Sequence, residues 1–385
     1  IYTYLEKRFG TWSYRTGAGF FLLSRTLVTS LRMFLVINVL QLFVFDNWGI
    51  PFWVNAMVFI ILAVLYTFRG GIRTIIWTDT LQTGFMLLAV VLSIIFISRE
   101  LNASVGNLVS EIRQSGMSKM FITDWHHERY FVKQFLSGMF ITITMTGLDQ
   151  EMMQKNLSCR NIREARKNMF TFSGILVLVN FLFLMLGAFL FLFAKKRGIS
   201  TGMSDELFPT IAFKYMSPLA GVVFMTGLIS AAFPSADGAL TSLTTSVSID
   251  FFRLDRRKDL TERKATRIRY LVHLAMASLL FICIMIFSLV NDRAIIDMLF
   301  TIAGYTYGPL LGLYAFGLFT KRKVSDRLTP VIAVLSPVIC FFLSENSLQL
   351  MNGYRFGFEL IILNGFLTFT GLLVFSRKNA GHQAL

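Results

Sequence analysis

The sequence predicts an all-α, polytopic transmembrane helix bundle, and three observations support this fold class. Hydrophobic residues make up 55% of the 385 residues, and the mean hydropathy is +0.62, whereas soluble domains are ordinarily about 45–50% apolar. The apolar residues form runs close to the roughly 20 residues that a helix needs to cross a bilayer. The period-two alternation of a membrane β-barrel is missing from these runs, so the spans are expected to be helices.

Ten candidate spans follow one another, separated by Gly or polar clusters. They are Gly17–Phe45, Pro51–Thr67, Thr74–Ser98, Val132–Met153, Asn168–Ala194, Pro218–Phe252, Ile268–Val290, Ala294–Thr320, Leu328–Ser344 and Phe358–Ser376. The segment between the third and fourth spans is long and mixed in charge, so it is expected to hold short amphipathic structure. We therefore expect one transmembrane domain over residues 1–385.

The formal net charge is +15, a balance that would suggest nucleic-acid binding in a soluble protein. Here the cations lie in short loops between apolar runs, so the lipid bilayer, and no nucleic acid, is the expected partner. Arg253–Arg269 holds eight basic residues, and together with Lys155–Lys167 and Lys321–Arg327 it predicts a cytoplasmic side for these loops. Lys195–Arg197 falls on the opposite side and disagrees. The prediction is a plasma-membrane protein with a cytoplasmic C-terminus.

Enzyme chemistry finds little support in the sequence. Cys159, Cys283 and Cys340 are an odd number with neither disulfide nor zinc-ligand spacing. The pair His126–His127 lies in the exterior loop without a ligand-spaced partner, so surface residues are favoured over a metal site. Neither a phosphate-binding Gly-rich loop nor a nucleophile elbow is present. We therefore expect no enzyme and no ATP-driven pump, and any uphill transport must use an ion gradient.

Ionisable residues inside the spans are the first functional candidates, because each costs at least ~2.5–3.5 kcal/mol to insert. The five are Arg25, Arg32, Asp79, Asp149 and Asp237. Arg32 lies too deep to reach the interface, so it should meet a substrate anion or one of the three aspartates, of which a structural pair is favoured. Arg25 is expected to extend to the interior surface. Asp79 is expected to cap the N-terminus of the third span.

The sixth span contains a run of small and hydroxylated residues, Ser230–Ser246, around Asp237. Pro234 has no amide hydrogen, so the carbonyl of Ser230 loses its helical partner. That carbonyl, Ser235 and Asp237 together could bind an alkali cation, since hydroxyl, carbonyl and carboxylate oxygens are hard ligands. The alternative is that these hydroxyls only pack and hydrogen-bond to their own helix.

A second polar interruption lies in the fourth span. Asp149 and Gln150 follow Gly147 in a segment where threonine hydroxyls recur. Broken, Gly-containing spans are the best sequence indication of a transporter's binding site. The alternative is an ordinary helix end near the cytoplasm, and the residues alone leave both open.

Several segments, taken in this order and spacing, resemble the sodium/solute symporter family over most of the chain. They are Tyr4-Leu-Glu-Lys-Arg-Phe9, Tyr66-Thr-Phe-Arg-Gly-Gly-Ile72, Trp77-Thr-Asp-Thr-Leu-Gln82, Ala231–Arg253, Gly308-Pro-Leu-Leu-Gly-Leu313 and Gly317-Leu-Phe319. The resemblance implies an inverted-repeat, leucine-transporter-like fold of two five-helix halves. On that map the chain holds core helices three to ten and two further helices, so we expect upstream residues, with the first two core helices, to be missing before Ile1.

The resemblance also implies site residues. The family's sodium site falls on the carbonyl of Ala231, then Pro234 and Ser235, where the family usually has two adjacent hydroxyls and this chain keeps one. Sodium coupling then needs the Ser230 carbonyl or Asp237 as a replacement ligand.

Family substrate contacts on the broken sixth core helix fall on Asp149 and Gln150. Family members that carry carboxylated sugars are understood to use an arginine on the third core helix, and Arg32 looks similar, which suggests an acidic substrate.

The function implied is sodium-coupled secondary active symport of a small organic solute by alternating access, with Na⁺ as the coupling ion. Two alternatives remain open. One is a solute sensor on the same scaffold that does not transport, motivated by the altered hydroxyl pair. The other is a proton-coupled symporter that uses Asp237 or Asp149.

Overall fold

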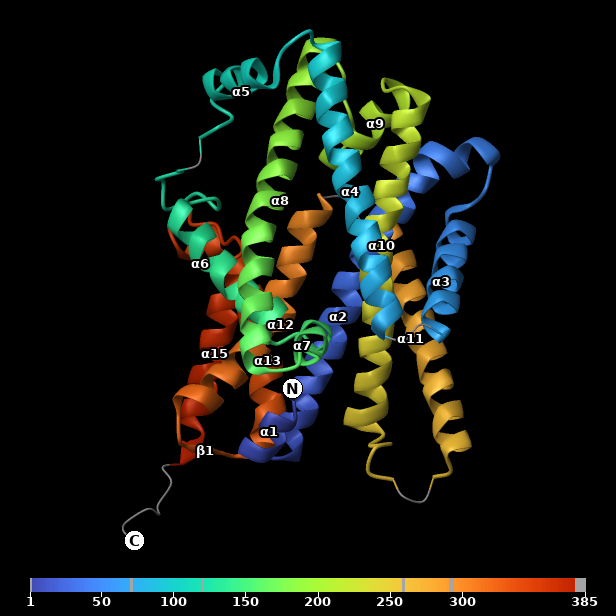
Figure 1. The fold of residues 1–385 in the computed structure, drawn as a ribbon. Coiled ribbons are helices and arrows are strands. Elements are labelled where there is room, and N and C mark those ends of the chain that lie inside the picture. Colours follow the sequence, from blue (N-terminus) through green and yellow to red (C-terminus); the bar gives the residue numbers. More distant parts are fainter. Residues whose placement is uncertain (1, 70–71, 120, 258–259, 291–293, 378–385) are drawn as a thin grey trace.

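The fold is a bundle of long helices, most of which are roughly parallel or antiparallel to one another (Figure 1). This computed structural model describes residues 2–69, 72–119, 121–257, 260–290 and 294–377, with the side chains of residues 68–69, 72–78 and 154–155 left out. The Gly-Gly turn at residues 70–71, part of the segment that resembles the symporter family, lies outside the described residues.

The α-helices are α1 (Thr3–Arg8), α2 (Thr11–Leu40), α3 (Phe52–Arg69), α4 (Ile72–Glu100), α5 (Val105–Gln114), α6 (Phe131–Thr142), α7 (Gln150–Leu157), α8 (Ile162–Arg197), α9 (Leu207–Lys214), α10 (Pro218–Ser246), α11 (Glu262–Val290), α12 (Ile295–Phe319), α13 (Thr329–Glu345), α14 (Ser347–Leu350) and α15 (Leu360–Val374). Short π-helical segments extend α2 (Gln41–Phe45), α6 (Ile143–Gly147) and α10 (Val247–Phe251), and 3₁₀ turns occupy Asp46–Trp48, Ser204–Glu206 and Asp326–Leu328. Strands β1 (Lys323–Val324) and β2 (Ser376–Arg377) pair antiparallel.

Every predicted span overlaps one or more helices of the described residues, and the all-α fold class is confirmed. In the described part of the chain, six helices are long and apolar enough to cross a membrane. The largest departure is the fourth predicted span, which is not one helix: α6 ends in the π-helical turn Ile143–Gly147, and α7 begins at Gln150. The amphipathic structure expected in the exterior loop is helix α5.

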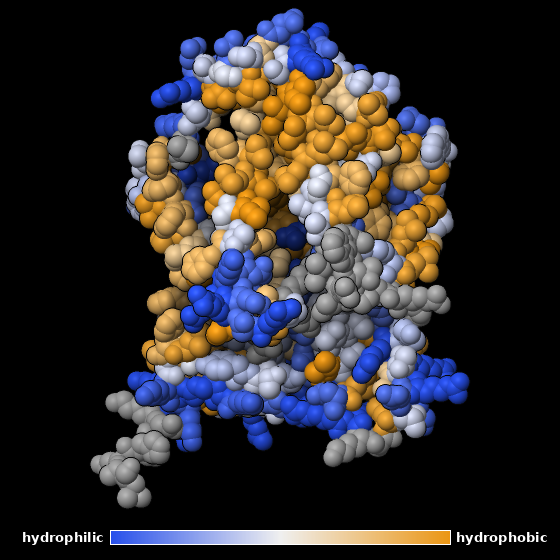
Figure 2. All heavy atoms as spheres, in the orientation of Figure 1, coloured by the Kyte–Doolittle hydropathy of each residue, from blue (hydrophilic) through white to orange (hydrophobic). Residues whose placement is uncertain are grey.

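The surface has the pattern of a membrane protein. Figure 2 shows a broad hydrophobic band around the middle of the molecule, with hydrophilic residues collected at its two ends. Many exposed side chains of the long helices are large and apolar, among them Phe170, Leu184 and Leu289. In water such a surface would cost free energy in proportion to its apolar area, and lipid removes that cost.

Helix α2 lies at the centre of the bundle and contacts α10, α11 and α12. Its start is fixed by a residue from far along the chain. Asp326 accepts hydrogen bonds from the amides of Trp12 and Ser13 at 2.9 and 2.7 Å, and from the Ser13 hydroxyl at 2.7 Å. Those amides are free donors at a helix N-terminus. A side chain on Gly10 would overlap the Asp326 carboxylate, so glycine is required for this approach.

The closest helix pair is α12 with α15. Gly304, Gly308 and Gly312 recur every four residues on α12 and face α15. A Cβ atom on Gly312 would come within 2.5 Å of the Gly365 carbonyl oxygen. Asn364 of α15 donates to the carbonyls of Gly304 and Tyr305 at 3.0 and 2.9 Å. Small residues at this spacing allow helix backbones to approach closely in a membrane.

Candidate solute and sodium site

The break between α6 and α7 is the structural centre of the candidate site. Asp149 Oδ1 accepts hydrogen bonds from the amides of Glu151 and Met152 at 2.9 and 3.1 Å, so this residue caps α7. The Tyr2 hydroxyl donates to the carbonyl of Leu148 at 3.1 Å. Two amides and one carbonyl at the break thus find partners within the chain, as backbone at membrane depth requires.

Arg25 of α2 neutralises the carboxylates at this break. Its guanidinium lies 3.3 Å from Asp149 Oδ2 and forms a second ion pair with Glu151. Arg25 is 8% exposed and Asp149 is 1% exposed, so the expectation that Arg25 extends to the interior surface is wrong. Two carboxylates brought by α7 hold it inside the bundle, and a buried guanidinium needs such partners.

Arg32 lies on the same face of α2 as Arg25, since seven residues make about two helical turns, or ~10 Å. The structure leaves it unpaired: no carboxylate among the described residues lies within ion-pair distance of its guanidinium. It does interact electrostatically with Arg25, Asp149, Glu151 and the buried Tyr307. The predicted Arg–Asp pair thus forms on Arg25, and Arg32 remains a cation beside the break.

The two substrate residues predicted at the break have different surroundings. Both oxygens of Asp149 are engaged, one by the α7 cap and one by Arg25. The Gln150 side-chain oxygen is enclosed and has no hydrogen-bond partner among the described residues. An enclosed amide oxygen without a partner loses the free energy of a hydrogen bond. Gln150 therefore remains available to a solute, whereas Asp149 is held by the protein.

Helix α10 continues through Pro234 without a break, which leaves the carbonyl of Ser230 without its usual amide donor. Other hydroxyls on this helix donate to backbone carbonyls of their own helix, as Thr241 and Ser242 do at 2.7 and 3.1 Å. Within the described residues, the hydroxyls of Ser230 and Ser235 make no hydrogen bond. The alternative of simple back-bonding thus describes hydroxyls on both sides of Pro234, Thr226 included, whereas those of Ser230 and Ser235 stay available as ligands.

Helix α10 contacts the break next to Asp237. This residue is buried, and its Oδ1 accepts a hydrogen bond from the Gly238 amide. A Cβ on Gly238 would overlap the Glu151 carboxylate, so α10 and α7 touch here. Ala231 is exposed and Ser235 half-buried, so these two residues, one turn apart, lie on an open face.

Asp79 has a different position from the one predicted. Helix α4 begins at Ile72, seven residues earlier, so Asp79 does not cap it. A Cβ on Gly227 of α10 would meet Ala89 of α4. The two helices are antiparallel and pack along their lengths. Asp79 precedes Ala89 by ten residues on α4, and Asp237 follows Gly227 by ten residues on α10, so the two aspartates lie near the same level.

Other candidate features lie apart from this site. His126 and Asp124 lie in the loop before α6, with their rings and carboxylates largely exposed, as predicted. Among the described residues, no group of His, Cys, Asp and Glu side chains has metal-binding geometry. Outside the membrane region, a hydrogen bond that Arg256 donates to the Glu6 carboxylate raises the pKa of Arg256 above its ordinary value.

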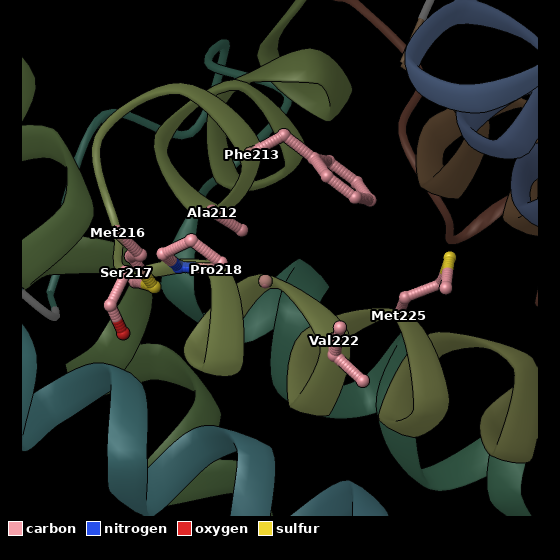
Figure 3. A pocket seen from close by; sticks show the side chains of 8 residues that line it. Ala212, Phe213, Met216, Ser217, Pro218, Val222 and Met225 are labelled. Atoms are coloured by element: carbon pink, nitrogen blue, oxygen red, sulfur yellow. The ribbon is translucent and has the colours of Figure 1, made fainter.

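Two cavities of the described residues are lined by side chains other than the predicted site residues. One of about 230 Å³ lies between α9 and the start of α10, where Phe213 and Met225 face a common space and Ser217 points away (Figure 3). A larger cavity, about 870 Å³, lies beside α6, α12 and α13 and is lined by Asp297, Tyr305 and Glu345 among others. Neither cavity contains the candidate side chains at the break.

Sequence reasoning missed three contributors to the site, namely Glu151, Tyr2 and Tyr307. Glu151 is two residues from Asp149 in a segment that the sequence predicts to be an interior helix end, and only the break turns it inward. Tyr2 precedes the first predicted span. Tyr307 is one of several aromatic residues of an apolar run, and nothing in the pattern separates it from core residues.

A bundle of long apolar helices, with a broken helix and ionisable side chains collected at the break, defines a multi-pass membrane transporter. The chain belongs to the sodium:solute symporter family, whose model matches residues 2–326. Its function is sodium-coupled symport of a small organic solute, and Na⁺ is the coupling ion.

Relatives and one solved structure agree with this assignment. The chain is 25% identical to the sodium/sialic acid symporter SiaT of Proteus mirabilis, over 87% of this chain and 69% of the relative. It is 22% identical to the sodium/sialic acid symporter NanT of Aliivibrio fischeri, over 96% and 73%. It is also 23% identical to the mouse sodium-coupled monocarboxylate transporter 1, over 82% and 52%.

The structure of a Na⁺-coupled sialic acid symporter, in a substrate-bound outward-open state, superposes with a TM-score of 0.80 at 17% identity. The match covers 98% of this chain and 78% of that one. At this identity the likeness shows a common fold.

Proposed function

We propose that the transported solute carries a carboxylate and that Arg32 binds it. The single observation behind this proposal is the unequal pairing of two arginines on one face of α2. Arg25 is neutralised by two carboxylates of the chain, and Arg32 by none among the described residues. A cation at membrane depth without a counter-ion is costly, and an anionic solute removes that cost.

Gln150 and Tyr307 complete the proposed solute site. Gln150 offers an enclosed oxygen without a partner, which suits a hydroxyl or amide donor of the solute. Tyr307 lies within electrostatic reach of Arg32. Asp149 acts in this proposal through Arg25 and the α7 cap, as a positioning residue. The relatives include sialic acid and monocarboxylate symporters, which agrees with an acidic solute.

For the sodium ion we propose oxygen ligands on α10. The hydroxyl of Ser235 and the backbone carbonyls of Ser230 and Ala231 supply hard donors, and Asp237 or Asp79 supplies negative charge. Such ligands suit a hard cation. The contact between Gly238 and Glu151 then links the ion's helix to the helix that bears Gln150. Coupling of this kind requires both ligands to favour one state, by typically about 1–3 kcal/mol.

The proposal extends to the protein's setting. We place it in the plasma membrane with a cytoplasmic C-terminus, since the basic loops 253–269 and 321–327 lie on that side under the positive-inside rule. We also infer that it performs no enzymatic chemistry and that residues 1–385 form one transporter domain.

Uptake by the full-length protein in proteoliposomes tests the solute class. Labelled carboxylated sugars, neutral sugars and amino acids are offered with and without an inward sodium gradient. We expect accumulation of a carboxylated solute, lost in Arg32→Gln and kept in Arg15→Gln, which removes an exposed cation of the same helix. Accumulation of neutral solutes alone, or full uptake by Arg32→Gln, would reject the carboxylate.

One observation favours a second candidate, a proton-coupled symporter. Pro234 occupies a position where the family usually carries a hydroxyl, and Asp237 is buried three residues later. A proton gradient that drives uptake without sodium would support this variant. Binding of solute without accumulation under either gradient would support a sensor.

A further inference from the structure

The first turns of α11 carry three cations that the protein leaves unpaired. Arg263, Lys264 and Arg267 are exposed, and none of them forms an ion pair with a described residue. Other basic side chains of the described residues do have acidic partners: Arg253 and Arg256 pair with Glu6, and Arg197 pairs with Glu100. We call the three residues the basic foot of α11.

The basic foot lies on the face of α11 that carries its exposed apolar side chains. Successive residues of an α-helix are 100° apart, so Arg263, Lys264 and Arg267 fall within one sector of about 100°. Continuing the helix, Leu271 and Leu274 fall in the same sector and are 60% and 58% exposed. The chain thus presents cations directly below an apolar stripe on one face of one helix.

We propose that the basic foot binds the phosphate of an anionic phospholipid, with Leu271 and Leu274 against its acyl chains. Phosphate suits guanidinium groups, which donate two parallel hydrogen bonds. Glu262 is the only acid in the first two turns, so the segment 262–267 has a net charge of +2. Tyr270, exposed just above the foot, has the character of a side chain at the membrane–water interface.

The arrangement distinguishes a lipid from a soluble anion. A free phosphate would use the cations alone, whereas a lipid also covers the apolar stripe above them. Each basic residue near an anionic membrane surface contributes on the order of fivefold in affinity. The proposal is independent of the solute and of the coupling ion, because the foot lies at the helix end, away from Arg32 and Ser235.

The test uses the full-length protein in neutral detergent, with lipids added back. Phosphatidylglycerol and phosphatidylcholine are titrated separately, and the thermal unfolding midpoint and the lipid retained in native mass spectrometry are measured. We expect phosphatidylglycerol to raise the midpoint and to be retained more than phosphatidylcholine. The triple variant Arg263→Gln, Lys264→Gln, Arg267→Gln should lose that preference, with apparent lipid affinity reduced tenfold or more.

The matched control is the triple variant Lys195→Gln, Lys196→Gln, Arg197→Gln, which removes three cations from the last turn of α8. It should keep the preference. If the basic-foot variant does not fold, the wild-type protein in about 1 M salt supplies the second readout, because screening should remove the preference. An unchanged preference in the foot variant or in high salt, or equal stabilisation by inorganic phosphate, overturns the proposal.

Discussion

At the scale of single residues, the contrast between Arg25 and Arg32 decides how the candidate site is interpreted. Both guanidiniums lie inside a bundle that lipid surrounds, and desolvation penalises each charge. The chain provides Asp149 and Glu151 for one and leaves the other beside an enclosed Gln150 oxygen. We therefore assign a structural role to Arg25 and propose a ligand-binding role for Arg32, whereas the sequence suggests that Arg25 extends to the surface and that Arg32 pairs with an aspartate.

Replacing Arg25 should damage the fold itself. Arg25→Ala leaves two buried carboxylates uncompensated, which typically costs about 3–5 kcal/mol. We expect a clear fall in the thermal unfolding midpoint of the purified protein, and partial recovery when Asp149→Asn and Glu151→Gln are added. A midpoint equal to that of the wild type would contradict the assigned ion pairs.

Replacing Ser235 should change the sodium requirement without changing the fold. Ser235→Ala removes one oxygen ligand, so we expect the sodium concentration for half-maximal uptake to rise about tenfold, equivalent to ~1.4 kcal/mol. Ser242→Ala is the control, because that hydroxyl already donates to the carbonyl of Ala239. Identical sodium dependence in the wild type and Ser235→Ala would remove this residue from the site.

At the scale of elements, long-range contacts fix helices that local sequence only outlines. The run of residues 17–45 predicts a span but not its start, and α2 begins at Thr11 because Asp326 caps it from more than 300 residues away. Likewise, composition predicts a fourth span through Met153, but the π-helical turn and the Asp149 cap end it earlier. Patterns of hydropathy predict where helices lie, whereas helix ends and helix breaks depend on contacts with residues elsewhere in the chain.

The cap on α2 gives a prediction for that helix. Asp326→Ala should lower the unfolding free energy by about 1 kcal/mol, the usual contribution of an N-cap. Asp326→Asn keeps an acceptor oxygen and should cost less. Thermal unfolding of the three proteins checks the order, and an Asn variant less stable than the Ala variant would contradict the capping role.

The α12–α15 contact gives a second prediction at this scale. Gly312→Ala places a Cβ against the Gly365 carbonyl and should destabilise the protein by about 1–3 kcal/mol through overpacking. Gly187→Ala on α8, where no atom lies within 4 Å of the added carbon, should be neutral or slightly stabilising. Equal unfolding midpoints for the two variants would contradict the close packing.

At the scale of the whole molecule, the fold class and the order of helices were predictable, because a bilayer forces apolar runs into helices and basic loops to one side. The pairing inside the site was not predictable. Arg25 and Glu151 are 126 residues apart, and the sequence offered three aspartates as equivalent partners for Arg32 and none for Arg25. The site residues Arg32, Asp149, Gln150, Ala231, Ser230, Ser235 and Asp237 stay predictions until transport is measured.

The central claim is that one chain couples sodium entry to the movement of a carboxylated solute bound at Arg32. The most direct measurement is sodium-driven uptake of a labelled carboxylated sugar by the full-length protein in proteoliposomes, with wild type, Arg32→Gln and Arg15→Gln compared in parallel. We predict accumulation above equilibrium with the wild type and Arg15→Gln only under a sodium gradient, and none with Arg32→Gln. Equal accumulation by Arg32→Gln, or accumulation that ignores sodium, would contradict the account.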